Sequence, residues 1–317
     1  MRSITVKPND ANQRIDKFLQ KYFKTMPLGM IYKCIRKKRV KVNGKKVEIN
    51  YKLVENDIID LYINDEFFKE TAQQDIFKIV KPNIDIIYED ENIILIDKKP
   101  GMVVHPDEKE QVDTLINHIK SYLYNKKEYL PEHENTFAPS LCNRIDRNTG
   151  GIVIAAKNAE ALRIVNEKIK SKEIRKFYLC IVRGILQKKT GSQTDYLIKD
   201  HSLNKVFISN KPETGGKEII TKYKVLKEKN NMSLLEVELI TGRTHQIRAH
   251  LASIGHPLIG DDKYGDKNFN RSMGFKYQAL YSYKLYFDFT SDAGILNYLK
   301  GKVFELKEVG FAKKFLS

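Results

Sequence analysis

The chain begins with a stretch whose apolar positions follow a helical spacing. Ile15, Phe18 and Leu19 recur three or four residues apart after Asp10, which carries the kind of side chain that caps a helix. Residues 30–36 show the same spacing. Two short helices are therefore predicted near the N-terminus, the first of them capped by Asp10.

An alternating pattern follows directly. Over residues 37–49, apolar and charged positions alternate on both sides of Asn43 and Gly44, a pair that strongly favours a tight hairpin turn. A further apolar stretch at 58–63 predicts one more strand. We therefore expect a small α/β domain over residues 1–64.

The periodicity is lost over residues 65–82, which we interpret as a linker, and a second domain is predicted over 83–290. An amphipathic pattern at 159–171 indicates a helix, and 185–215 suggests two short strands with a loop. The remaining apolar runs predict strands at 84–88, 93–97, 152–156, 176–184, 218–227, 234–241 and 279–289. Residues 291–317 are expected to form a short helix or a C-terminal tail.

The charge of the chain is strongly positive and unevenly distributed. Its 56 Lys and Arg against 40 Asp and Glu give a net charge of +16, and residues 1–60 alone carry 15 against 6, a net charge of +9. Such an excess attracts polyanions, and nucleic acid is the first candidate. An anionic membrane is the rival, but no apolar run reaches 18 residues and no signal-peptide pattern is present. We expect a cytoplasmic protein that does not bind membranes.

The cysteines and histidines give no metal-binding pattern. Cys34, Cys142 and Cys180 include no CxxC pair, so buried thiols in a reducing compartment are expected. His245 and His250 are five residues apart, which does not align them on one helix face, and no HExxH motif occurs. No glycine-rich phosphate loop follows a strand either. We therefore predict neither a metal nor a cofactor.

One carboxylate has an unusual setting. Asp146 lies between Arg144 and Arg147, and a turn of small residues leads from it into the apolar run 152–156. A carboxylate between two guanidiniums should stay ionised below its free pKa of about 3.9. It therefore suits a nucleophile better than a proton donor. The alternative is a structural ion pair in a surface turn, which would contribute little.

The segment around Asp146 resembles the catalytic motif of RluA-type pseudouridine synthases, usually HRLD followed by a Thr/Ser-Gly turn. Here it reads Asn143-Arg144-Ile145-Asp146, and Thr149 is followed by Gly150. Asn replaces the usual His, and Gly replaces Ser at 150. Neither departure affects the reacting carboxylate.

Three further segments resemble motifs of this family, in the family's order. Residues 99–106 look like KPxGxxVHP, and 176–184 look like KxYxAxVxG with Tyr178 at the family's active-site tyrosine. Residues 242–251 look like GR[ST]HQ[IL]RxH, followed at 255–265 by a GHPxxGDxxYG stretch. This last match fixes many polar identities and is the most specific one.

The resemblance implies an α+β fold, with a mixed, mainly antiparallel sheet flanked by helices, and isomerisation of uridine to pseudouridine in RNA. Asp146 would be the nucleophile or the base that activates the ribose. Arg243 would pair with it, and Tyr178 would stack on the uracil. We also expect the Tyr178 hydroxyl to remove the carbon-5 proton, with stacking alone as the alternative. Arg144 would enter the base stack that the flipped uridine vacates. Other RNA contacts are expected from His105, Arg147, Thr149, His245, Gln246 and Arg248.

Residues 10–62 resemble the small RNA-binding domain named after ribosomal protein S four of the small subunit. Its motif elements include 14–19, 35–36 and 40–45. That domain binds RNA through shape and phosphate charge. Expected RNA contacts are Arg14, Arg36, Lys37, Lys38, Lys41 and Lys45.

The substrate expected from this combination is structured RNA, in particular large-subunit ribosomal RNA, with tRNA as the alternative. The competing class is a catalytically silent RNA-binding factor in ribosome assembly, which would need none of Asp146, Tyr178 and Arg243. A monomer is expected.

Overall fold

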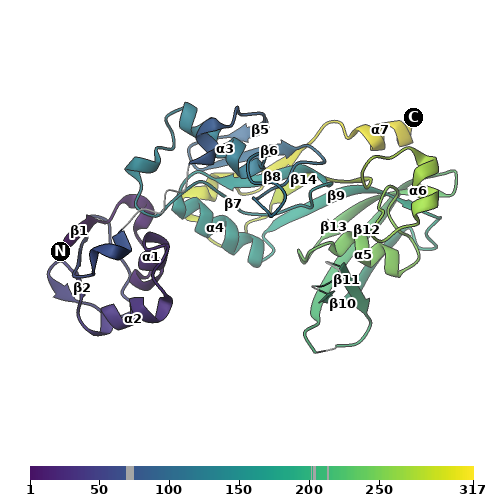
Figure 1. The fold of residues 1–317 in the computed structure, drawn as a ribbon. Helices are drawn as coiled ribbons and strands as arrows, with labels where there is room; N and C mark the ends of the chain where they lie inside the picture. The colour runs from purple at the N-terminus through teal and green to yellow at the C-terminus, as the bar shows by residue number, and fades with distance from the viewer. Residues whose placement is uncertain (69–74, 201, 203–204, 213) are drawn as a thin grey trace.

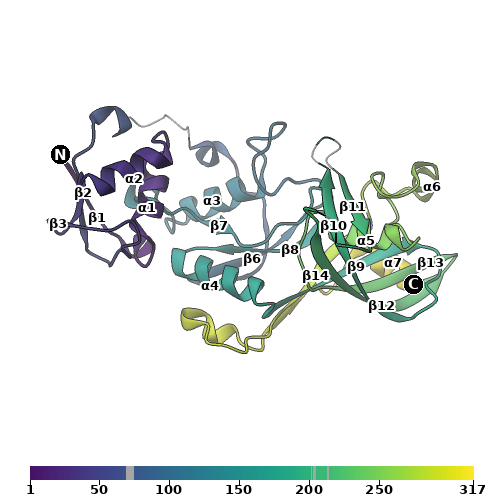
Figure 2. The same ribbon diagram turned by 90° about the horizontal axis from the view of Figure 1, so that it is seen from below.

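A computed structural model describes residues 1–68, 75–200, 202, 205–212 and 214–317. Two units lie side by side, a small one at the N-terminus and a larger one built on a long twisted sheet (Figure 1). The turned view shows the small unit next to the end of the larger one that carries α4, Ala159–Lys170 (Figure 2). No helix within the described ranges has the length and apolar character needed to cross a membrane.

The small unit packs two helices on an antiparallel sheet. Strand order is β1-β4-β2-β3. The predicted hairpin turn is confirmed, since Asn43 and Gly44 have φ angles of 50° and 74°, the left-handed values that such a turn requires. The elements are β1 Arg2–Thr5, α1 Ile15–Tyr22, α2 Leu28–Arg36, β2 Val40–Val42, β3 Lys45–Lys46 and β4 Ile58–Leu61.

Asp10 does not cap the first helix, so that prediction is wrong. It ends the short 3-10 turn η1, Pro8–Asp10, and α1 begins after Arg14. The Asp10 side chain is fully buried against the larger unit. There its carboxylate accepts hydrogen bonds from Thr136 Oγ1 at 2.6 Å and Asn135 Nδ2 at 2.7 Å. The Asp10 side chain therefore links the two units instead of capping α1.

The segment predicted as a linker is partly structured. It contains the 3-10 turns η2, Asp65–Phe68, and η3, Ile76–Ile79, and residues 69–74 lie outside the described part. Phe68 packs on the core of the small unit, and Phe77 is buried in the larger one. These isolated aromatic anchors are too irregularly spaced to produce a periodic pattern.

The larger unit is built on one sheet, and the predicted mixed, mainly antiparallel character is confirmed. The order is β11-β10-β12-β13-β9-β14-β8-β6-β5, with β7 beside β8 and β15 beside β14. Among the described strand pairs of this sheet, β14 and β8 run parallel and the others run antiparallel. The strands are β5 Asp85–Glu89, β6 Ile93–Lys98, β7 Ser140–Leu141, β8 Gly150–Ala156, β9 Ile174–Arg183, β10 Thr190–Asp200, β11 Lys205–Ser209, β12 Lys217–Lys229, β13 Met232–Leu239, β14 Leu280–Phe287 and β15 Val303–Glu305.

The continuous apolar runs of β6 and β8 are explained by burial on both faces of the sheet. One face carries α3, Leu115–Asn125, and α5, Gln246–Ser253, and the other carries α4. The smaller helices α6, Lys267–Met273, and α7, Gly310–Leu316, pack near the other end. Alternate residues of each central strand therefore enter different cores.

The C-terminal segment is part of the fold: of the two alternatives predicted for it, the short helix is present as α7, and a tail is not formed. β15 pairs with β14, and Leu296 and Leu299 in η5, Gly294–Leu299, are fully buried. Phe315 in α7 is buried in a cluster with residues of β9 and β13. Each of these elements is short and carries only two or three apolar anchors, which gives little periodic signal.

Candidate active site

The loop from β7 to β8 presents Asp146, and its two ends are fixed by hydrogen bonds. Asn143 Oδ1 accepts from Ile154 N at 2.8 Å, so the residue that replaces the family's His holds the loop to β8. Thr149 N donates to Asp146 O at 3.0 Å, and Gln278 Nε2 donates to Thr149 Oγ1 at 3.1 Å. Thr149 is 2% exposed, which corrects its expected RNA contact, because its side chain closes the loop instead.

Gly151 is required at the start of β8. Its φ is 113°, a left-handed value that side chains rarely adopt, and a Cβ there would lie 2.2 Å from the backbone oxygen of Ser282. The glycine thus lets β8 approach β14 closely and holds the catalytic loop against the sheet.

Lys98 is a buried residue of this site that the sequence reasoning missed. Its ammonium is 1% exposed and donates to the carbonyl oxygens of Lys99, Met102 and Arg147 at 2.9, 2.9 and 3.0 Å. Burial lowers the pKa of Lys98 to about 7, although the nearby Asp146 charge works in the other direction. The three bonds tie the loop after β6 to the catalytic loop. In the sequence, the position of Lys98 at the end of the apolar strand 93–98 was the one sign that this lysine could be buried.

The guanidinium that contacts Asp146 belongs to Arg248, not to Arg243 as expected. Arg248 Nη1 donates to Asp146 Oδ2 at 2.8 Å. Arg243 is exposed, and its backbone nitrogen donates to Gln246 Oε1. The two arginines are five residues apart, but only Arg248 lies on the buried face of α5. The predicted pairing of Arg243 with Asp146 is therefore wrong.

A second carboxylate holds Arg248 in place. Asp261 accepts from Arg248 Nε at 2.7 Å and from Nη2 at 2.9 Å, the two-pronged geometry that fixes a guanidinium plane. Burial opposes the charge of Arg248, but the hydrogen bonds from Arg248 to Asp261 and Asp146 raise its pKa above the ordinary value. The side chain of Asp146 is 24% exposed, and within the described part of the chain no donor contacts its Oδ1. One carboxylate oxygen is thus anchored and the other is available for chemistry.

His245 and Gln246 have different roles, although both were expected to bind RNA. His245 Nε2 lies 3.9 Å from Asp146 Oδ2, and burial lowers the pKa of His245 to about 4. Gln246 is 2% exposed and donates to Thr221 Oγ1 at 3.0 Å and Ile220 O at 3.1 Å. The expected RNA contact of Gln246 is corrected, since its side chain fixes the turn before α5 to β12.

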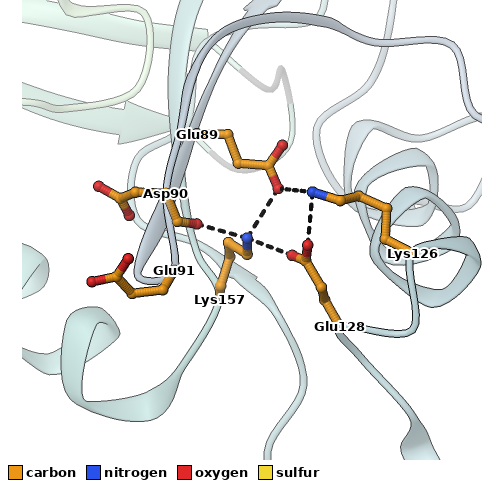
Figure 3. A pocket seen from close by; sticks show the side chains of 6 residues that line it. All are labelled: Glu89, Asp90, Glu91, Lys126, Glu128 and Lys157. Carbon is orange, nitrogen blue, oxygen red and sulfur yellow. Dashed lines mark hydrogen bonds and ion pairs between the residues drawn. The ribbon is translucent and has the colours of Figure 1, made fainter.

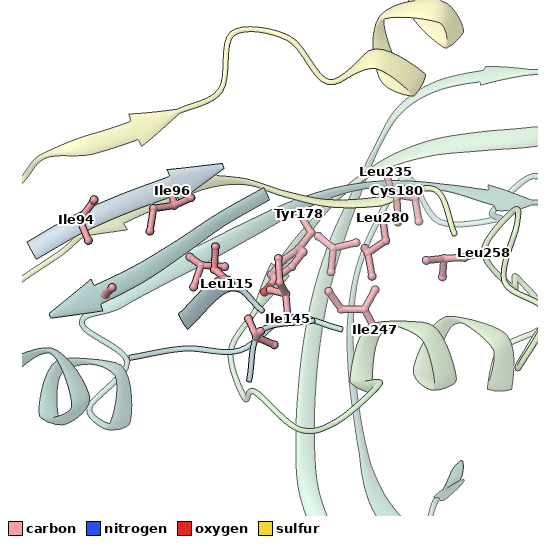
Figure 4. Close-up of a cluster of buried hydrophobic side chains, with 14 of the residues drawn as sticks. Ile94, Ile96, Leu115, Ile145, Tyr178, Cys180, Leu235, Ile247, Leu258 and Leu280 are labelled. Carbon is pink, nitrogen blue, oxygen red and sulfur yellow. The ribbon is translucent and has the colours of Figure 1, made fainter. Parts of the chain in front are cut away.

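Tyr178 lies in the apolar core beneath the loop. It is 4% exposed and belongs to the same cluster as Ile145 and Ile247, the chain neighbours of Asp146 and of Arg248 respectively (Figure 4). Burial raises the pKa of Tyr178 to about 12, which the Asp146 charge reinforces, while a hydrogen bond with Ser282 works the other way. The phenol is therefore a weaker acid than a free tyrosine, and the expected role of its hydroxyl as the base stays a prediction, which Tyr178→Phe tests.

Of the remaining predicted RNA contacts, Arg248 is corrected, because it is 8% exposed and its guanidinium holds Asp146 and Asp261; Lys41 is half-buried, and the others lie on the surface. Arg144, Arg147 and His105 are exposed near the loop, and partial burial and the charge of Arg144 lower the pKa of His105. Arg147 Nε also donates to Gly101 O at 3.0 Å. On the small unit, Arg36, Lys37, Lys38 and Lys45 are exposed.

Arg14, which is exposed, and the half-buried Lys41 are partly engaged within the small unit. Arg14 donates through Nε and Nη2 to the buried Asp16 carboxylate, both at 3.0 Å. Lys41 is half-buried, with its Nζ 5.3 Å from the centre of the Tyr62 ring. Both side chains therefore have structural partners before any RNA binds.

A separate hollow of about 530 Å³ is lined by charged side chains of both signs: Glu89, Asp90, Glu91, Lys126, Glu128 and Lys157 (Figure 3). Across the described ranges, no group of three or more His, Cys, Asp or Glu is arranged to hold a metal ion. The expected independence from metals remains a prediction, which activity after dialysis against EDTA would test.

The sheet of the larger unit thus presents one carboxylate, anchored by Arg248, on a loop over a core that contains Tyr178, and a small basic unit lies next to it. The family model for RNA pseudouridylate synthase matches residues 92–253, and the S4 domain model matches 13–59. The chain belongs to the RNA pseudouridylate synthase family and carries an N-terminal S4 domain.

Several relatives cover most of the chain. It is 35% identical over 286 residues to an uncharacterized RNA pseudouridine synthase of Mycoplasma genitalium, covering 89% of this chain and 88% of that one. It is 33% identical to ribosomal large subunit pseudouridine synthase C of Buchnera aphidicola, with 83% and 81% covered. It is 32% identical to synthase D of Borreliella burgdorferi, with 90% and 85% covered.

The fold is also found among solved structures. Human RNA Pseudouridylate Synthase Domain Containing 4 matches with a TM-score of 0.56 and 20% identity, over 72% of this chain and 89% of that one. At this identity the likeness concerns the fold alone.

Proposed function

We propose that the enzyme isomerises specific uridines in large-subunit ribosomal RNA, acting as a monomer in the cytoplasm. The observation that carries the proposal is the Asp146 carboxylate, which Arg248 anchors through Oδ2 and which leaves Oδ1 open. The relatives named as large-subunit enzymes C and D support the choice of RNA. The exposed basic residues of the S4 domain support a structured substrate.

The chemistry needs only one carboxylate. The glycosidic bond is broken and remade at the same ribose, so no second carboxylate has to activate a water molecule. Asp146 acts as the nucleophile or as the base that activates the ribose. Arg248 holds that carboxylate in a fixed orientation, because Asp261 has already fixed the plane of the Arg248 guanidinium.

The target uridine must leave its stack to reach Asp146, at a cost of a few kcal/mol. Arg144 is exposed two residues before Asp146 and is suited to enter the space that the base vacates. The basic residues of the S4 domain hold the RNA backbone meanwhile. Tyr178 supplies the ring beneath the flipped uracil.

Carbodiimide-based mapping of pseudouridine in total RNA tests the proposal. RNA is compared from cells with the gene, without it, and without it but carrying Asp146→Asn. We expect particular large-subunit sites to disappear in the second and third strains. Loss of tRNA sites instead would move the substrate to tRNA. Unchanged maps in all three would indicate a catalytically silent RNA-binding factor.

A further inference from the structure

The hydroxyl of Tyr264 connects an outer strand of the sheet to the histidine beside Asp146. Val206 N, in β11, donates to Tyr264 Oη at 3.0 Å. The same oxygen lies 2.9 Å from His245 Nδ1, and the two rings meet edge to face with centroids 5.6 Å apart. His245 has a left-handed backbone, φ 54°, directly before α5, which turns its ring toward Asp146.

These contacts favour one of the two positions for the imidazole proton. The Val206 N–H donor occupies one lone pair of Tyr264 Oη, so the hydroxyl proton of Tyr264 can point at His245 Nδ1. The ring proton then lies on Nε2, which faces the Asp146 carboxylate. The tautomer protonated on Nδ1 would instead turn a lone pair of Nε2 toward the negative Asp146 oxygen, which is repulsive. Burial, which lowers the pKa of His245 to about 4, keeps the ring neutral.

The gap between the His245 ring and the Asp146 carboxylate has room for one bridging oxygen atom. His245 Nε2 and Asp146 Oδ2 are 3.9 Å apart, too far for a direct hydrogen bond. One oxygen at about 2.8 Å from each atom would bridge them. That oxygen must accept from Nε2–H and donate to the carboxylate, which a water molecule or a hydroxyl group can do. Within an RNA strand the nucleoside offers one free hydroxyl, at the 2′ position.

We propose that Tyr264 is a positioning residue that holds His245 in its Nε2-protonated form, and that His245 and Asp146 together bind the ribose 2′-hydroxyl of the target uridine. The inference rests on the proposed function, because it names the part of the substrate bound at the same site. Asp146 Oδ2, which Arg248 anchors, then accepts a hydrogen bond from the 2′-hydroxyl. Asp146 Oδ1 is left to react with the target nucleoside. The arrangement selects RNA over DNA at the target nucleotide.

The first experiment measures the tautomer directly, without turnover. Nitrogen-15 spectra of the full chain labelled in its histidines are recorded for the wild type and for Tyr264→Phe, with His245→Gln to assign the signal. We expect Nε2 protonated in the wild type and a smaller Nε2-protonated population in Tyr264→Phe, which keeps the aromatic ring. A wild-type ring protonated on Nδ1, or an unchanged population in the variant, overturns the role of Tyr264. This result stands even if no pseudouridine is ever detected.

The second experiment tests the hydroxyl contact with two RNAs that differ only in uridine or 2′-deoxyuridine at the target. On the uridine RNA, His245→Ala should slow single-turnover product formation about 10- to 100-fold, the size expected for a lost hydrogen bond in a partly buried site. On the deoxyuridine RNA the same substitution should have little effect. Equal losses on both RNAs overturn the contact. If the deoxyuridine RNA is not turned over, the comparison is made with equilibrium affinities.

His256→Ala is the matched control for both experiments. His256 also makes a ring hydrogen bond, from Nδ1 to Arg183 O at 2.9 Å, away from Asp146. Its removal should leave the His245 signal and both rates near those of the wild type.

Discussion

Two clusters of charged side chains in this protein look alike in composition and differ in how their charges are paired. In the hollow of Figure 3, Lys126 and Lys157 each contact both Glu89 and Glu128, at 2.5 to 2.9 Å, so the four charges form a closed ring. At the active site, Arg248 is shared between Asp261 and only one oxygen of Asp146. In the hollow every one of these four charges has two partners, whereas at the active site Asp146 keeps one oxygen without a donor in the described part of the chain.

The largest loss of activity is expected for Asp146→Asn, which removes the incompletely paired carboxylate. The substitution keeps size and polarity but removes the reactive carboxylate, so we expect product formation to fall at least about 10⁴-fold while RNA binding stays near the wild-type value. Single-turnover assays and filter binding measure the two quantities. Measurable pseudouridine from the purified variant at a near-normal rate would contradict the assignment.

Arg248→Met should be the next most damaging change. It leaves Asp261, which is fully buried, and the anchored oxygen of Asp146 without their cation. Breaking such a pair costs about 3–5 kcal/mol of unfolding free energy, and we expect a loss of activity of about 10²-fold or more. The matched control is Arg243→Met, which should leave thermal stability unchanged because Arg243 is exposed. If Arg243→Met lost as much activity and stability as Arg248→Met, the corrected pairing would be wrong.

The basic face of the S4 domain can be weakened without touching either charged cluster. Replacing Arg36, Lys37 and Lys38 together by Gln removes three exposed charges at the end of α2 and beyond. RNA affinity should fall about tenfold near physiological salt, and its salt dependence should become shallower by about 0.7 to 0.9 per lost phosphate contact. Binding titrations at several salt concentrations measure both. An unchanged slope would exclude phosphate contacts by these residues.

Tyr178→Phe separates the two roles of the buried ring. Because burial raises the pKa of the phenol to about 12, the hydroxyl is protonated at neutral pH, and we expect the variant to keep its rate within about tenfold. If the hydroxyl were the base, the loss would be about 10²-fold or more. The wild-type rate would then climb with pH toward 12 and the variant's would not. Rates from pH 6 to 9 decide between the two.

The smallest effect on activity is expected for Glu89→Gln, inside the closed ring. Burial alone would raise the pKa of Glu89, but hydrogen bonds from Lys126 and Lys157 lower it below 4.5. The ion pairs of Glu89 therefore stabilise the fold at pH values above the pKa of Glu89 in the unfolded chain. This stabilisation is lost as the pH falls through the lower pKa that Glu89 has in the folded protein. The variant should lose less than about 1 kcal/mol at pH 7. Wild-type stability should fall toward that of the variant below pH 4, with catalysis unaffected at pH 7. A catalytic defect would give the hollow a function.

The sequence was most informative where one residue identity carries the chemistry. Asp146 and Tyr178 could be located because their motifs fix the residue in a loop and a strand. The partner of Asp146 could not, because the choice between Arg243 and Arg248 depends on the left-handed turn at His245, which no local pattern predicts. Thr149 and Gln246 have the composition of binding residues, but burial gives them structural roles.

The fold was predictable in its strands and less so at its joints. Long apolar runs identified the central strands, whereas the C-terminal elements and the 3-10 turns of the linker depend on single anchors such as Phe77. Asp10 shows the limit most clearly, since its hydrogen-bond partners lie more than 120 residues further along the chain.

The contact made by Asp10 also has a consequence for the RNA that we propose as the substrate. The S4 domain is docked on the larger unit through Asp10 and through Asn9, whose Oδ1 accepts a hydrogen bond from Ala159 N at 2.9 Å. These contacts hold the basic face of the S4 domain at a set distance from Asp146. An RNA gains both contacts only if its backbone and its target uridine are spaced to match. Selection by such a spacing requires no recognition of the bases that lie in between.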